Sequence, residues 1–327
     1  MIISQIIWWI WNQMFQYAFG HYIAQQTNSE LFLDINWLGR PTFDWYQKRN
    51  FALANLSIPN LKYIYTPFHK QNSTDRNLFD YWRFFANNKL GIYSHKYDII
   101  NQEWFEYKSE YTDQIKSKYT TNINNKNFIN HWSYWSSTYL VWFRQSEKFR
   151  KPIANQIKND FKIWYEIPQI AKDLIHKIKS TNSIAINVRR ADFVQIGKIA
   201  NIHDVCTTKY YQDAIDYIYQ KYSDLWSTCE FFVFSDDLDR CRQNLNFPSP
   251  FTIVYPNIYK WFEYELYMYI LWQCQNYIIP NSSFARWSVY LWRELEKTII
   301  IPDKWFNNDL NTNDLIPAKR NAIKIKV

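Results

Sequence analysis

The sequence predicts an α/β protein of two lobes, with a mostly parallel β-sheet in the C-terminal lobe. Apolar runs of strand length alternate with stretches that repeat apolar residues at helical spacing, a pattern typical of parallel sheets with helices on both faces. The chain has 327 residues, 47% of them hydrophobic, which is ample for a large core. We expect an N-terminal lobe over residues 1–165 and a C-terminal lobe over residues 166–327.

The N-terminal lobe should begin with a strand at residues 2–7, a helix capped by Asn12, and a second strand at residues 31–35. Residues 40–130 are rich in aromatic residues and asparagine and predict few elements, and a helical pattern returns at residues 140–163. The first helix is predicted from apolar residues at helical spacing, namely Met14, Phe15, Ala18, Phe19, Tyr22 and Ile23.

The C-terminal lobe should open with a helix that begins at Pro168, because proline suits a first helical turn. Its expected apolar face consists of Ile170, Ala171, Leu174, Ile175 and Ile178. Residues 317–327 are expected to form a loosely held basic tail. Four strands are predicted at residues 184–188, 231–234, 251–255 and 277–279, with helices at 210–219 and 261–272.

Three of these strands end in polar clusters, which would meet at one edge of a parallel sheet. There, two arginines and a hydroxyl-rich helix start could bind a diphosphate without a glycine loop. The clusters are Asn187-Val-Arg189-Arg190-Ala-Asp192, Ser235-Asp236-Asp237 and Asn281-Ser282-Ser283-Phe284. Taken one by one they have ordinary interpretations, since Asp237 and Asn281 could cap helices and Asp237-Leu-Asp239 is a weak metal-site signal. Together they predict a nucleotide or phosphosugar site.

Composition narrows the functional classes. Only four glycines are present and none lies within six residues of another, which excludes the glycine-rich loops that cradle dinucleotides or nucleoside triphosphates. The net charge of +8 suits a polyanionic partner, either a phosphate-bearing substrate, an acidic membrane surface in peripheral association, or nucleic acid. Four dispersed cysteines, no transmembrane segment and no signal peptide predict reduced thiols and a cytoplasmic location.

Six motifs, in order over residues 1–300, resemble glycosyltransferase family 11, the α-1,2-fucosyltransferases. The family's NQMFQYA, HVRRGDY, FSDD and NSSFSWWGAW correspond to the segments that start at Asn12, Asn187, Phe234 and Asn281. Its QSEKYF and C-x-x-x-YY-x-x-AI correspond to the segments that start at Gln145 and Cys206. This ordered set argues against a single-stranded nucleic-acid binder.

The resemblance implies a GT-B-like architecture and an inverting, metal-independent transfer of fucose from GDP-fucose, without a cofactor, to a glycan hydroxyl such as O2 of galactose. It implies an acceptor side in the N-terminal lobe and a nucleotide-sugar site in the C-terminal lobe. Catalytic roles fall to Arg189, Arg190 and Asp192. Donor contacts fall to Asn12, Gln13, Asn187, Ser235, Asp236, Asp237, Asn281, Ser282, Ser283 and Phe284.

Several motif glycines of the family are replaced in this chain. Its Gly-Gly-Leu-Gly is Trp8-Trp-Ile-Trp11, and further glycines correspond to Trp142, Trp261, Ala191 and Ser288. A tryptophan adopts a positive φ only at a cost and adds a large ring. The rings at positions 8, 9 and 11 would therefore either fill the donor crevice or pack as core. A catalytically silent glycan- or nucleotide-binding protein with the same fold remains the alternative to an active transferase.

Overall fold

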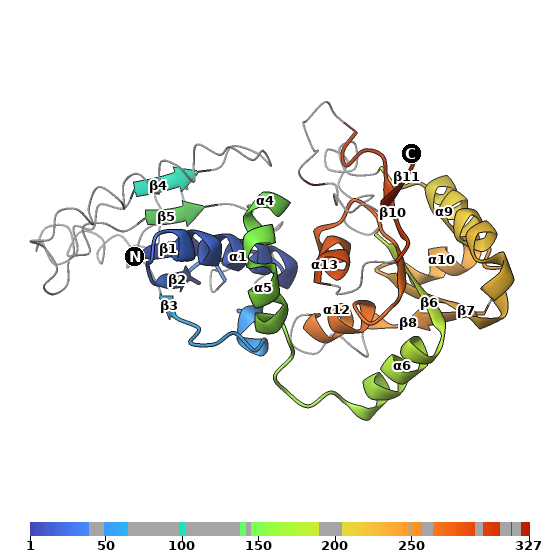
Figure 1. Ribbon diagram of the computed structural model, residues 1–327, viewed down its shortest axis with the longest axis horizontal. Coiled ribbons are helices and arrows are strands. Elements are labelled where there is room, and N and C mark those ends of the chain that lie inside the picture. The colour runs from blue at the N-terminus through green and yellow to red at the C-terminus, as the bar shows by residue number, and fades with distance from the viewer. Residues whose placement is uncertain are drawn as a thin grey trace, which may run out of the picture. The chain divides into compact units, whose positions relative to one another are not determined.

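The computed structural model describes residues 1–38, 49–64, 98–101, 138–141, 145–189, 205–248, 250–256, 264–291, 297–307, 315 and 322–327. The chain forms two compact units, each built of strands and helices (Figure 1). The first comprises residues 1–54, 58–145 and 149–153, and the second comprises residues 55–57, 146–148 and 154–327.

The first unit contains a parallel sheet with the strand order β3-β2-β1-β5-β4. Its helix α1 (Ile10–Gln26) packs on β1 and β2. The central β1 contributes buried residues on both of its faces, as parallel strands covered on both sides do. The strands are β1 (Ile2–Gln5), β2 (Leu31–Asp34), β3 (Tyr63–Ile64), β4 (Asp98–Asn101) and β5 (Thr138–Val141), and the short helices that lie wholly or partly in this unit are η1 (Ala52–Asn55), α4 (Glu147–Arg150) and η4 (Lys151–Ile153).

Two predictions for this unit are wrong in detail. The N-cap of helix α1 is Trp9 and not Asn12, so the helix begins three residues earlier than predicted, after Trp8 turns the chain with a φ of 71°. The helix predicted from residue 140 is also displaced. Residues 140 and 141 belong to β5, where they pair with β4, and helical structure resumes only at Glu147.

Gly20 lies on the face of α1 that touches the sheet. A Cβ atom at this position would lie 2.9 Å from Ser4 Cβ in β1 and 2.8 Å from Leu31 Cδ1 in β2. Both distances are shorter than ordinary van der Waals contact. The separation between α1 and the sheet therefore requires glycine at this position.

The second unit contains a parallel sheet with the order β11-β10-β9-β6-β7-β8. Helices cover both of its faces, as predicted: α9 and α10 pack on one, and α12 on the other (Figure 1). The strands are β6 (Asn182–Val188), β7 (Cys229–Ser235), β8 (Phe251–Val254), β9 (Asn276–Ile278), β10 (Ile299–Pro302) and β11 (Ala322–Ile325). The helices are α5 (Ala154–Asp160), α6 (Gln169–Ser180), α9 (Thr208–Lys221), η5 (Ser223–Thr228), α10 (Leu238–Asn244), α12 (Glu265–Leu271) and α13 (Ser283–Leu291).

The four strands predicted for this unit are confirmed as β6, β7, β8 and β9. On α6, however, Ile170 is 53% exposed and does not join the buried face formed by Ala171, Leu174 and Ile178. The predicted loose tail is also wrong for its last residues. They form β11, which pairs in parallel with β10, and Asp303 donates its N–H to the carbonyl oxygen of Ile325 (3.0 Å).

The units divide near Ala154, whereas the sequence placed the boundary after residue 165. The segment that follows α5 packs in the second unit, where Phe161 makes an edge-to-face contact with Trp287 at a centroid distance of 5.3 Å. All four cysteines, Cys206, Cys229, Cys241 and Cys274, are buried and free.

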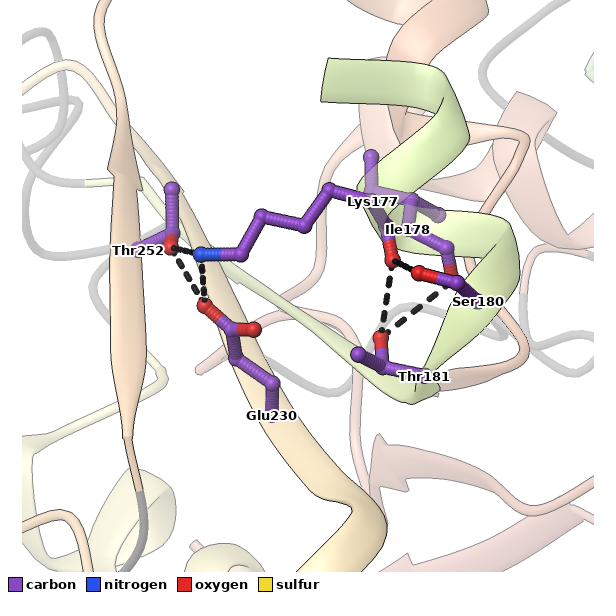
Figure 2. A network of polar contacts seen from close by, with 6 residues as sticks. All are labelled: Lys177, Ile178, Ser180, Thr181, Glu230 and Thr252. Atoms are coloured by element: carbon purple, nitrogen blue, oxygen red, sulfur yellow. Dashed lines mark hydrogen bonds and ion pairs between the residues drawn. The ribbon is translucent and has the colours of Figure 1, made fainter. Parts of the chain in front are cut away.

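A polar network ties α6 to the sheet of the second unit (Figure 2). Lys177 Nζ donates to Glu230 Oε1 (2.6 Å) on β7 and to Thr252 Oγ1 (2.8 Å) on β8. The Thr252 hydroxyl in turn donates to the same carboxylate oxygen. At the end of α6, the Ser180 and Thr181 hydroxyls both donate to the carbonyl oxygen of Lys177 (3.0 and 3.2 Å). The network thus ties the last turn of α6 to β7 and β8.

Replacing Lys177 with methionine is expected to lower the free energy of unfolding by about 1 kcal/mol, because the nearly buried Glu230 carboxylate loses its cationic partner but keeps Thr252. Lys172→Met is the matched control, since Lys172 pairs with Glu166 in an ion pair that is largely exposed. It should change the stability by less than about 0.5 kcal/mol. Urea unfolding measures both variants, and equal losses would contradict the role of the network.

Candidate functional site

The second unit brings the ends of β6, β7 and β9 together, because these strands are neighbours in the parallel sheet. Asn187 is the next-to-last residue of β6, Ser235 is the last residue of β7, and Asn281 follows β9 after a short connection. Their polar groups therefore share the carboxyl edge of the sheet, the edge at which open α/β folds bind ligands.

Arg189 follows β6 and forms an ion pair with Asp236, which follows β7. Its Nε lies 3.3 Å from Asp236 Oδ2, and the two side chains are 20% and 24% exposed. A partly exposed guanidinium at this edge suits an anionic group such as a phosphate, because it offers donors in a planar fork. The other two predicted catalytic residues, Arg190 and Asp192, lie outside the described residues.

The loop after β7 is fixed by its own hydrogen bonds. Asp237 is the N-cap of α10, and its Oδ1 accepts from the backbone N–H of Arg240 (3.2 Å). Ser235 Oγ accepts from the N–H of Asp237 (2.9 Å). The helix-capping interpretation of Asp237 is therefore the one that the geometry supports, and Ser235 and Asp237 hold the loop that presents Asp236.

Tyr267 on α12 supports the same loop, and sequence analysis did not identify it. Its hydroxyl accepts from the N–H of Ser235 (3.1 Å) and donates to the carbonyl oxygen of Val254 (3.1 Å). Burial raises the pKa of Tyr267 well above its ordinary value, so the phenol stays protonated and able to donate. Phe284 stacks on the Tyr267 ring at a centroid distance of 5.9 Å.

The segment after β9 is held by hydrogen bonds to other residues of the second unit. Asn281 Nδ2 donates to the carbonyl oxygen of Trp305 (2.8 Å), and its Oδ1 accepts from the Cys206 thiol (3.7 Å). Ser282 is buried, and its carbonyl oxygen accepts from the N–H of Arg286 as α13 begins at Ser283. Asn281 therefore positions the start of α13 rather than offering a free amide.

Asn187, which was predicted to contact the sugar donor, has a hydrogen-bond acceptor that is not used within the described residues. Its Nδ2 donates to the carbonyl oxygen of Phe234 (3.1 Å), which ties the end of β6 to β7. Its Oδ1 is buried and has no hydrogen-bond partner among the described residues. A buried acceptor of this kind is costly unless a ligand or water satisfies it.

In the first unit, Asn12 and Gln13 lie near the start of α1. Gln13 uses its whole amide internally: Nε2 donates to the carbonyl oxygens of Trp8 and Asn50 (both 2.9 Å), and Oε1 accepts from the N–H of Ala52 (3.0 Å). Gln13 thus joins the turn at Trp8 to the segment that contains Asn50 and Ala52. Asn12 Oδ1 accepts from Gln145 Nε2 at 3.4 Å.

The tryptophans at positions 8, 9 and 11 lie where the chain enters α1, and we call residues 8–11 the tryptophan turn. The Trp9 and Trp11 rings stack with a centroid distance of 5.2 Å and an interplanar angle of 16°, and the Arg49 guanidinium lies 3.5 Å from the Trp9 centroid. Trp11 is buried as core, whereas Trp8 and Trp9 are half-buried. Trp142 and Trp261, at two other motif-glycine positions, lie outside the described residues.

Within the described part of the chain, no group of three or more metal-ligating side chains lies close enough to hold an ion. Among those residues, likewise, no helix is long and apolar enough to cross a membrane.

Two units that each contain a parallel sheet are the architecture of GT-B-like proteins, and the arginine–aspartate pair lies at the carboxyl edge of the second sheet. A family model described as glycosyl transferase family 11 matches residues 10–323. The chain therefore belongs to glycosyl transferase family 11, and the resemblance that its motifs indicated is confirmed. It is a glycosyltransferase of the fucosyltransferase-like kind.

Two curated relatives from Escherichia coli support this assignment. An alpha-1,2-colitosyltransferase is 28% identical over 325 residues, which covers 98% of this chain and 97% of the relative. The O-antigen biosynthesis glycosyltransferase WbnK is 25% identical over 310 residues, which covers 90% and 91%.

Solved structures confirm the GT-B-like α/β fold. NodZ alpha-1,6-fucosyltransferase, soaked with GDP-fucose, has a TM-score of 0.50 and 17% identity, over 94% of this chain and 96% of that one. POFUT1 in complex with GDP-fucose has a TM-score of 0.51 and 14% identity, over 89% and 93%.

Proposed function

We propose that this protein transfers fucose from GDP-fucose to a hydroxyl of a glycan acceptor, O2 of a terminal galactose, with inversion and without a metal ion. The observation that carries the proposal is the Arg189–Asp236 pair at the carboxyl edge of the second sheet. The relative named for α-1,2 transfer supports the linkage, and two structural neighbours, one soaked with GDP-fucose and one in complex with it, support the donor.

The leaving group of this reaction is GDP, on which negative charge develops as the sugar departs. Arg189 is placed to stabilise that charge by hydrogen bonds to a phosphate, and such prearranged donors act most strongly in the transition state. Asp236 holds the guanidinium by its Nε at the carboxyl edge of the sheet. Asn187 Oδ1 supplies a buried acceptor for a donor group of the nucleotide sugar.

A second function is favoured by the tryptophan turn. Two half-buried indole rings stand where the family places glycines, and they would suit a protein that binds a glycan or a nucleotide without turning it over. Binding without turnover separates this function from the first.

The experiment is incubation with GDP-fucose and lactose, followed by mass detection of a fucosylated product. GDP-colitose serves as a second donor because one relative is named for colitosyl transfer. Turnover with either donor in EDTA is the expected result. Turnover that EDTA abolishes and Mn²⁺ or Mg²⁺ restores would instead assign Asp236, Asp237 and Asp239 as metal ligands. Calorimetric binding of GDP without any product would favour the second function.

A further inference from the structure

The start of helix α9 is tied to the segment that leads from β9 into α13. Tyr210, in the first turn of α9, donates from its hydroxyl to the carbonyl oxygen of Ile279 (2.6 Å), the residue directly after β9. The Cys206 thiol, which lies just before α9, donates to Asn281 Oδ1 (3.7 Å). Both donors belong to the C-x-x-x-YY-x-x-AI motif, so this motif reaches the polar cluster that begins at Asn281.

Both of these hydrogen bonds are shielded from water. Tyr210 has no exposed surface, and Cys206 is buried as well. Burial raises the pKa of Tyr210 well above its ordinary value, so the phenol keeps the proton that it donates. Removing one donor of a buried hydrogen bond is costly, because the acceptor that remains is cut off from water. The two bonds therefore fix the path of the chain at residues 279–281.

The chain between β9 and α13 depends on such bonds for its course. Residues 279–282 belong to neither element, and the residues from Asn281 to Phe284 carry the predicted donor contacts. Asn281 is also held by the carbonyl oxygen of Trp305, to which its Nδ2 donates (2.8 Å). A displacement of Ile279 or Asn281 would therefore shift the start of α13 at the carboxyl edge of the sheet.

The opposite end of α9 provides a matched contrast. Tyr222, the C-cap of α9, donates from its hydroxyl to Asn276 Oδ1 (2.9 Å), on the first residue of β9, and shares a hydrogen bond with the Thr298 hydroxyl (2.8 Å). A tyrosine hydroxyl thus ties each end of the helix to the neighbourhood of β9. The Tyr210 contact lies at the carboxyl end of this strand, where the candidate site is, and the Tyr222 contact lies at its amino end.

We propose that Tyr210 and Cys206 are positioning residues, which hold the segment from Asn281 to Phe284 in the geometry that binds the nucleotide of the sugar donor. Neither residue needs to touch the ligand, since each acts through the backbone or the amide of the segment. A prearranged segment binds more tightly because less freedom is lost on binding. The inference rests on the proposed function for the identity of the donor.

The test compares Tyr210→Phe with Tyr222→Phe, because each change removes one phenolic hydroxyl and keeps the ring. Both variants should lower the melting temperature by about 2–4 °C, the effect of one hydrogen bond. Only Tyr210→Phe should weaken GDP binding and raise the KM for GDP-fucose, each by about fivefold. The KM for lactose should stay the same in both variants. Calorimetry with GDP, steady-state kinetics and melting curves give these values.

Cys206→Ala and Cys206→Ser repeat the test in case Tyr210→Phe folds poorly. Alanine removes the donor to Asn281 and should weaken GDP binding by about threefold, whereas serine keeps a donor and should restore the affinity. Equal GDP affinity in the wild type, Tyr210→Phe and Cys206→Ala would overturn the positioning role while leaving the proposed function intact. So would an equal loss of affinity in Tyr210→Phe and Tyr222→Phe, which would reflect stability alone. A wild-type protein that binds no GDP would overturn both the donor and this inference.

Discussion

Arg189→Ala is expected to lower kcat/KM with GDP-fucose by about 10²–10³-fold and to remove most of the thermal stabilisation that GDP gives the wild-type protein. The guanidinium follows β6 at the carboxyl edge of the sheet, where Asp236 fixes it, and it offers a planar set of donors that alanine lacks. The same result is expected for Arg190→Ala, which tests the neighbouring residue of the motif. The measurements are steady-state kinetics and melting curves with and without GDP.

The control for this experiment is Arg242→Ala. Arg242 forms an ion pair with Asp239 at 3.2 Å on α10, in the same unit but with a side chain 43% exposed. Its removal should leave both the kinetics and the GDP-induced shift unchanged. Equal GDP stabilisation in the wild type, Arg189→Ala and Arg190→Ala would count against a donor site at this edge.

Trp287→Ala is expected to lower the free energy of unfolding by about 3–5 kcal/mol. Trp287 on α13 has no exposed surface and makes edge-to-face contacts with Phe161 (5.3 Å) and Tyr290 (5.5 Å). Alanine would leave a large cavity between α13 and the segment after α5, which can close only in part.

Trp164→Ala makes the same truncation where the ring is 63% exposed, and it should cost less than about 1 kcal/mol. Urea denaturation of the two variants, followed by circular dichroism, gives the comparison. A loss for Trp287→Ala no greater than that for Trp164→Ala would show that the α13 core does not stabilise the unit in the way the packing indicates.

The sequence predicted the second sheet well because strands buried on both faces appear as continuous apolar runs, as in β6 and β7. The prediction failed where apolar residues are mixed with charged or polar ones. Strand β11 alternates apolar residues with lysines and resembles a basic tail, and only its pairing with β10 makes it a strand. The start of α1 was missed because Asn12 is a good N-cap in isolation, whereas the strained Trp8 sets the start of the helix.

The sequence motifs could predict residues of the candidate site, but not the hydrogen bonds that hold those residues in place. Adjacent strands had to bring Arg189 and Asp236 to one edge, and the motifs identified both residues. By contrast, the partners of Gln13 lie 37 and 39 residues away along the chain, and Tyr267 lies 32 residues from Ser235. Long-range hydrogen bonds of this kind leave no local pattern in the sequence.

Gly20 has a consequence for how far the sequence of this protein can change. At position 8 a motif glycine corresponds to tryptophan, and the chain accommodates the larger residue by strain. At position 20 the addition of a single methyl group would press on Ser4 and Leu31 in two neighbouring strands. A residue larger than glycine is therefore accommodated in the half-buried turn at position 8 and excluded at position 20, between the helix and the sheet. In a mutational library, variation at position 8 should be tolerated far more often than variation at position 20.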